Sequence, residues 1–185
     1  IGDRYYPRGI VLDNLYRPTD LESADIDQDG QDELLLCSFG DEGGDFSIYE
    51  RDVIGVNFVS EPVATLYSGT GAIRCQTHDF NNDGLLDIVL MVSDFDEHLS
   101  VYLNLGDGSF DEKRIVETHP AFGFADLQLV DFNHDGHIDI LTANGDNVDS
   151  DPYNTRKRFH GVRLYLNDGQ LGFDESYFYP MYGCF

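Results

Sequence analysis

The sequence reads DFNNDGLLD over residues 79–87, and the same acidic pattern occurs twice more, as DIDQDGQDE at 25–33 and DFNHDGHID at 131–139. Each copy has oxygen-bearing side chains at positions 1, 3, 5 and 9 and a glycine at position 6. The copies begin at residues 25, 79 and 131, so they are 54 and 52 residues apart. A regular step of this size is typical of a protein built from repeated four-stranded units.

The spacing of the oxygens predicts a calcium site in each copy. Ca²⁺ takes about six to eight oxygen ligands, and residues 1, 3 and 5 of a tight loop turn their side chains inward together. The glycine permits the turn, the backbone carbonyl of position 7 is free to coordinate, and the acid at position 9 closes the shell. No Cys or His side chain stands at a side-chain ligand position, which disfavours zinc. The predicted ligands, about three Ca²⁺ in all, are Asp25, Asp27, Asp29, Gln31 and Glu33; Asp79, Asn81, Asp83, Leu85 and Asp87; and Asp131, Asn133, Asp135, His137 and Asp139.

Two other interpretations of the acidic pattern are weaker. An EF-hand needs flanking helices and a Glu at position 12, but Leu36, Leu90 and Thr142 stand there. Short apolar runs typical of buried strands follow each loop instead. Acidic turns that use Asp, Asn and Gly only for their geometry are the second alternative. Three copies in one frame favour the metal sites.

Each loop is expected to join the first two strands of a four-stranded unit. The repeats span approximately residues 16–67, 68–118 and 119–181, and residues 1–15 would supply a strand of a preceding unit. Glycine turns at 105–108 and 168–172 suit the hairpin between the third and fourth strands. The predicted strands are 22–24, 34–38, 46–50 and 58–66; 72–78, 88–93, 99–104 and 110–117; and 124–130, 140–143, 162–167 and 173–178.

The loops, the apolar strand after each, and the segment LNLGDGSF at 103–110 resemble FG-GAP repeats, also called VCBS repeats. That family includes the head of integrin α subunits and many secreted bacterial proteins. The resemblance implies an all-β fold of β-propeller blades, each of four antiparallel strands, with residues 1–185 forming a single propeller segment. Three blades cannot close a ring, so we expect a larger propeller of about six to eight blades, or association of the chain with copies of itself.

Composition limits the partners. The net charge of −24, from 35 acidic and 11 basic residues, disfavours nucleic acid. No apolar run is long enough to cross a bilayer, so membrane insertion is not expected. Loops of this kind fill at roughly millimolar calcium, which favours an extracellular, periplasmic or cell-surface location. Of the three cysteines, Cys37 and Cys75 lie in strand-like segments and are expected to be buried thiols.

The leading functional hypothesis is a calcium-binding module with a structural role, or with a protein or carbohydrate ligand. The resemblance places partners on the face opposite the calcium loops, where the long 144–160 connection has an acidic half and a basic, aromatic half. A solvated insertion without a partner is the alternative for that loop, and a solvated acidic edge is expected at 40–45 and 93–98.

Two other functional hypotheses remain open. One is the propeller of a polysaccharide-acting enzyme such as a lyase, with His160, Arg156 or Arg158 as candidates. The other is a cell-adhesion module. No nucleophile elbow, zinc-protease helix or phosphate loop is present, so no catalytic residue is assigned and a non-enzymatic role is favoured.

Overall fold

The computed structural model describes residues 12, 15–40, 43–52, 57–118, 122–145 and 159–181. These ranges contain twelve strands and no helix. They also contain no helix long and apolar enough to cross a membrane.

The strands form three four-stranded antiparallel sheets, and in each sheet neighbours in sequence are neighbours in space. The first sheet contains β1 (Pro18–Ala24), β2 (Glu33–Ser38), β3 (Asp45–Tyr49) and β4 (Ala64–Ser68). The second contains β5 (Ala72–His78), β6 (Asp87–Val92), β7 (His98–Asn104) and β8 (Phe110–Glu117). The third contains β9 (Phe124–Val130), β10 (Asp139–Asn144), β11 (Gly161–Asn167) and β12 (Phe173–Pro180).

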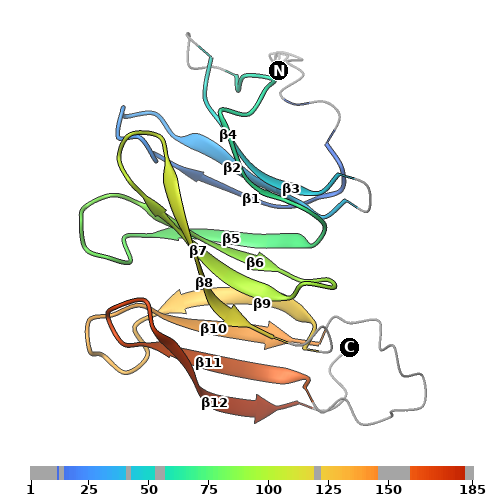
Figure 1. The fold of residues 1–185 in the computed structure, drawn as a ribbon, viewed down its shortest axis with the longest axis vertical. Helices are drawn as coiled ribbons and strands as arrows, with labels where there is room; N and C mark the ends of the chain where they lie inside the picture. Colours follow the sequence, from blue (N-terminus) through green and yellow to red (C-terminus); the bar gives the residue numbers. More distant parts are fainter. Residues whose placement is uncertain are drawn as a thin grey trace, which may run out of the picture.

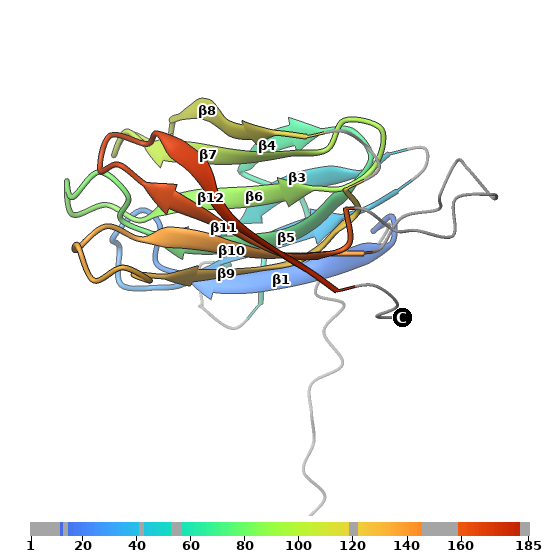
Figure 2. The same cartoon turned by 90° about the horizontal axis from the view of Figure 1, so that it is seen from below.

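The three sheets stack in sequence order, as Figure 1 shows. The first strands β1 and β9 run along one side of the stack, and the last strands β4 and β8 lie on the opposite side (Figure 2). The prediction of an all-β fold with four-stranded antiparallel repeats is confirmed, and the stacking fits blade-like repeats. The described residues form an open stack, so the larger closed propeller stays a prediction.

Two apolar cores lie between the sheets. One packs Phe46 and Ile48 of the first sheet against Leu90 of the second. The other packs Met91 of the second sheet against Phe124 of the third. Successive side chains of a strand point to opposite faces, so the central strand β6 is buried on both faces. This explains why its sequence is a continuous apolar run and does not alternate.

The strand predictions are confirmed within one residue at most ends in the second and third repeats, with β12 two residues longer than expected. The first repeat differs. Its first strand begins four residues earlier, and the fourth strand, predicted at 58–66, begins only at Ala64. Phe58 instead forms an isolated bridge with Arg51, whose guanidinium carbon lies 4.9 Å from the centre of its ring. Of the predicted strand within residues 1–15, only residues 12 and 15 are described, and neither lies in a strand.

Candidate metal centre

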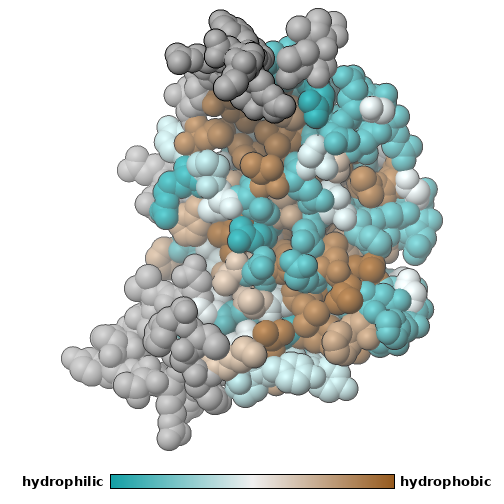
Figure 3. Space-filling view, turned by 180° about the vertical axis from the view of Figure 1, so that it is seen from behind, coloured by the Kyte–Doolittle hydropathy of each residue, from teal (hydrophilic) through white to brown (hydrophobic). Residues whose placement is uncertain are grey.

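The three acidic loops lie along one edge of the stack. They connect β1 to β2, β5 to β6 and β9 to β10, at the left of Figure 1. On the face seen in Figure 3 this edge, now at the right, is largely hydrophilic. The first two loops touch, because the Gln28 side-chain amide donates a hydrogen bond of 2.7 Å to the carbonyl oxygen of Gly84.

The loops share one backbone conformation. The position-6 glycines have φ values of 90°, 88° and 91°. Gln28, Asn82 and His134 at position 4 are also left-handed, with φ values of 63°, 61° and 61°. Non-glycine residues rarely adopt this conformation. The same two left-handed positions in every copy mean that one turn geometry is built three times.

Backbone N–H groups hold the side-chain oxygens of each loop in place. The position-1 carboxylate accepts a hydrogen bond from the position-6 N–H, at 3.1, 2.9 and 3.1 Å in the three loops. The position-5 carboxylate accepts one from the position-7 N–H, at 2.8, 2.8 and 2.9 Å. The side chain at position 3 accepts one from the position-5 N–H, at 3.0, 2.9 and 3.0 Å. The side chains at positions 1, 3 and 5 are therefore held by the same three kinds of hydrogen bond in each loop, and their role as ligands stays a prediction.

The first loop carries the most concentrated negative charge. One carboxylate oxygen each of Asp25, Asp27 and Asp29 lies within 4.8 Å of the other two. Asp25 Oδ1 is buried and has no hydrogen-bond partner in the part of the chain that the structure describes. A buried oxygen of this kind is costly unless a donor or a cation satisfies it. The carboxylates of Asp25, Asp27 and Asp29 together form a donor set of the type that a hard divalent cation takes.

The second and third loops have one carboxylate fewer than the first at the predicted ligand positions, because position 3 is an asparagine. Asn81 Nδ2 donates to Asp83 Oδ2 at 2.9 Å, and Asn133 Nδ2 donates to Asp135 Oδ2 at 2.8 Å. The His137 N–H and then the Asn133 amide lower the pKa of Asp135 by hydrogen bonding to its ionised form.

The position-9 acids are buried and tie the loops to the sheets. Glu33, Asp87 and Asp139 each accept a hydrogen bond from the position-2 N–H, at 2.8, 2.9 and 2.9 Å. The second oxygen of Asp87 accepts the N–H of Asn104, and that of Asp139 accepts the N–H of Asn167, both at 2.9 Å. Desolvation raises the pKa of Glu33 and Asp87. Glu33 is not in the group of carboxylates gathered within 4.8 Å. The structural role of these acids is clear, and their role as ligands stays a prediction.

Sequence reasoning missed the asparagine that ends the third strand of a repeat. Asn104 Nδ2 donates to the carbonyl oxygen of Ile26 in the first loop, at 2.8 Å, and to that of Leu86 in its own loop, at 3.2 Å. Its equivalent Asn167 donates to the carbonyl oxygen of Ile138, at 3.1 Å. The signal for this role was the same Leu-Asn pair just before each glycine turn.

Most of the long 144–160 connection on the expected partner face lies outside the described residues. Residues 146–158 of the long connection are not described, and they include the candidates Arg156 and Arg158. His160 is described and is buried, with 3% of its surface exposed. It is therefore not a surface histidine.

The expectation of a solvated acidic edge at 93–98 was wrong for Glu97. This residue is 3% exposed. Its carboxylate accepts hydrogen bonds from the Phe124 N–H and the Ser93 hydroxyl, both at 3.2 Å, and from the Thr118 hydroxyl at 3.3 Å. Desolvation raises its pKa. Glu97 thus anchors the second sheet to the start of the third.

The expectation of buried thiols is confirmed, since Cys37 and Cys75 are buried and free.

Comparison with known proteins agrees with the repeat geometry. The family model for the FG-GAP-like repeat matches residues 25–90 and 79–142. Each match begins at position 1 of one acidic loop and continues past the next loop. No curated protein matches the chain. The two matches together cover residues 25–142 of the 185 residues, and the chain therefore belongs to the FG-GAP-like repeat family.

Proposed function

We propose that the protein is a calcium-binding β-propeller module of the FG-GAP or VCBS type that acts outside the cytoplasm. The proposal rests on the first loop, where one carboxylate oxygen each of Asp25, Asp27 and Asp29 lies within 4.8 Å of the other two, and where Asp25 Oδ1 is buried without a hydrogen-bond partner among the described residues. Oxygen ligands held by backbone N–H groups suit Ca²⁺ better than a metal that prefers nitrogen or sulfur.

The role of the metal in this proposal is structural. Each ion lies between the first and second strands of a repeat and offsets the repulsion between clustered carboxylates. Three ions offset six of the 24 negative charges and leave a net charge of −18. A protein or carbohydrate ligand would bind on the opposite edge, where the connections between the second and third strands lie, and the remaining propeller blades or further copies of the chain would cover the open sheet faces.

Calcium titration of the chelated protein tests the proposal, and the chain supplies its own matched variants. Asp27→Asn gives the first loop the asparagine that Asn81 and Asn133 provide in the other two. Asn81→Asp makes the opposite change in the second loop. We expect about three Ca²⁺ to bind, with the first loop tightest because it has the highest carboxylate count.

In calorimetry, Asp27→Asn should weaken the tightest site to the level of the others, and Asn81→Asp should strengthen one of the weaker sites. Failure of the wild-type protein to bind Ca²⁺, or a first loop that is the weakest of three, would contradict the proposal. A rise of the melting temperature on addition of Ca²⁺ should accompany binding.

A further inference from the structure

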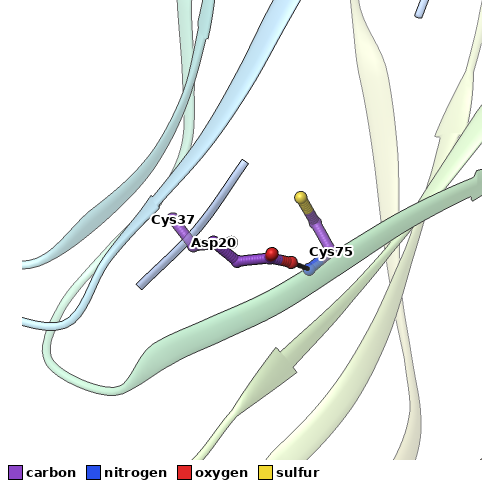
Figure 4. Close-up of side chains that lie close together, drawn as sticks. All are labelled: Asp20, Cys37 and Cys75. Atoms are coloured by element: carbon purple, nitrogen blue, oxygen red, sulfur yellow. Dashed lines mark hydrogen bonds between the residues drawn. The ribbon is translucent and has the colours of Figure 1, made fainter. Parts of the chain in front are cut away.

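Two buried cysteines meet where the first sheet packs on the second. Cys37 lies on β2 and Cys75 on β5, and 0% and 3% of their surfaces are exposed. Their sulfur atoms and a carboxylate oxygen of Asp20, on β1, all lie within 4.8 Å of one another. Figure 4 shows the three side chains approaching from three different strands. Sulfur atoms from both sides of a sheet boundary are thus within reach of each other.

The surroundings of the two sulfurs are apolar. Both cysteines belong to the core cluster that contains Ala24, Phe46 and Ile48. The neighbouring Cys37 side chain and then burial raise the pKa of Cys75 far above the ordinary range of a thiol. The Cys75 side chain is therefore an uncharged thiol in the folded, reduced protein.

Asp20 is already engaged by other groups. Its Oδ2 atom accepts the Cys75 N–H at 3.0 Å, drawn as a dashed line in Figure 4. Its Oδ1 atom lies 3.9 Å from Nη1 of Arg74. A zinc site needs about four ligands, whereas a disulfide needs only two sulfurs and is uncharged. The environment of the sulfurs is apolar, and the Asp20 carboxylate already has other partners. Both facts favour a disulfide over a zinc site.

We propose that Cys37 and Cys75 are a disulfide-forming pair that covalently joins the first repeat to the second. The oxidant is a small-molecule disulfide such as oxidised glutathione. The thiolate of one cysteine attacks it, forms a mixed disulfide and releases one thiol. The thiolate of the other cysteine then attacks the protein sulfur and releases the second thiol. The protein loses two hydrogens, and the reagent is reduced to two thiols.

The reaction belongs to the folding stage, because thiols that are buried in the folded protein react slowly. The bond encloses residues 38–74, which include β3 and β4. Hydrogen bonds already bring the first strands of the two repeats together at this place. The Thr19 hydroxyl donates to the carbonyl oxygen of Ala72 at 2.7 Å, and the Thr77 hydroxyl donates to Glu22 Oε1, also at 2.7 Å. The disulfide would add a covalent link to this boundary.

The test uses the full chain with Cys184→Ser, so that only the two buried cysteines can pair. The protein is refolded with saturating Ca²⁺, once in a mixture of reduced and oxidised glutathione and once with a phosphine reductant. We expect the first sample to lose two hydrogens by intact mass and to yield a linked peptide pair containing residues 37 and 75. Its melting temperature should exceed that of the reduced sample by roughly 5–15 °C.

The matched control adds Cys37→Ala and Cys75→Ala, and its melting temperature should not depend on the refolding mixture. If this variant does not fold, the linked peptide in the Cys184→Ser protein decides the question alone. Two alkylatable thiols after oxidative refolding would overturn the proposal. It would also be overturned if the reduced protein bound one equivalent of zinc chloride and the control variant did not, because the cluster would then be a metal site.

Discussion

The buried carboxylate of Asp87 illustrates how a single residue joins a loop to its sheet. Its two oxygens accept the backbone N–H groups of Phe80 and Asn104, one before and one after it in the chain. Asp83 in the same loop is exposed, and among the described residues its hydrogen bonds stay within the loop. Asp87 therefore has a structural role within the protein, whereas a role for Asp83 in binding metal is a prediction.

Replacing Asp87 and Asp83 one at a time with asparagine should distinguish these roles. Asp87→Asn directs an amide N–H₂ toward a backbone N–H and leaves one donor unsatisfied, which costs about 1–3 kcal/mol of unfolding free energy. We expect this loss in urea unfolding both with Ca²⁺ and with a chelator. Asp83→Asn should reduce only the extra stability that Ca²⁺ provides. Equal effects of the two variants in the chelator would contradict the structural role of Asp87.

The buried His98 should make the unfolding free energy depend on pH. The side chain is fully buried, and its Nδ1 atom lies 2.7 Å from the carbonyl oxygen of Asp96. Desolvation lowers the pKa of His98 below its ordinary value of 6.5, with Arg114 contributing in the same direction. As the pH falls below 6.5 the unfolded chain binds this proton before the folded chain does, so unfolding free energy should fall.

The measurement is urea unfolding of the wild-type protein and of His98→Gln between about pH 7.5 and pH 5, with Ca²⁺ kept saturating. The difference in unfolding free energy between the two proteins should shrink as the pH falls. Only the wild-type protein has a histidine at position 98 whose protonation favours the unfolded chain. The comparison is needed because carboxylates with a raised pKa, such as Glu97, contribute with the opposite sign. Parallel pH profiles for the two proteins would refute the prediction.

At the scale of the elements, the third strand of the second repeat is tied to the first repeat through its last residue. Asn104 and Asn167 occupy equivalent positions and are equally buried, at 3% and 4% exposure. The Asn104 amide reaches the carbonyl oxygen of Ile26 in the neighbouring loop as well as one in its own loop. The Asn167 amide bonds to Ile138 in its own loop. A comparison of the two asparagines therefore measures the contribution of the hydrogen bond between repeats.

Asn104→Ala should therefore cost more stability than Asn167→Ala. The first change leaves the Ile26 carbonyl without its partner in addition to the losses that the two variants share, and an unpaired buried acceptor costs about 1–3 kcal/mol. Urea unfolding of both variants with saturating Ca²⁺ measures the difference. An equal or smaller loss for Asn104→Ala would show that the bond across the repeats contributes nothing.

The sequence predicted those elements whose signal is local. The run from Ile88 to Val92 is apolar at every position, and β6 is buried on both faces as such a run requires. The fourth strand of the first repeat was misplaced, because no glycine turn fixes its register and Phe58 is apolar but pairs with Arg51. The roles of Asn104 and Glu97 were missed because one partner of each, the Ile26 carbonyl and the Phe124 N–H, lies in another repeat. One sequence does not show which distant backbone groups need a donor or an acceptor.

For the whole molecule, charge is the dominant global property. The net charge is −24, and the acidic loops of all three repeats lie along one edge. Like charges this close repel over distances comparable to the Debye length, about 10 Å at 0.1 M salt. Folding brings them together, so the folded protein without metal should be more sensitive to ionic strength than the metal-loaded protein.

Melting the protein in a series of sodium chloride concentrations tests this expectation. With a chelator present, the melting temperature should rise by several degrees between about 0.05 and 0.5 M salt because the repulsion is screened. With saturating Ca²⁺ the rise should be smaller, because the ions already offset part of the charge. Equal slopes in the two series would mean that the loops carry no metal-dependent repulsion.

Each sheet is formed by four consecutive strands, and this has a consequence for folding during synthesis on the ribosome. The strands of the first sheet end at residue 68, before those of the second begin at residue 72. Every partner that a strand needs within its sheet has thus been translated before the next sheet starts to emerge. The nascent chain can complete its repeats one at a time, in the order of translation. The face of the first sheet that carries Cys37 stays uncovered until the second repeat folds onto it. During that interval the Cys37 thiol is accessible to an oxidant.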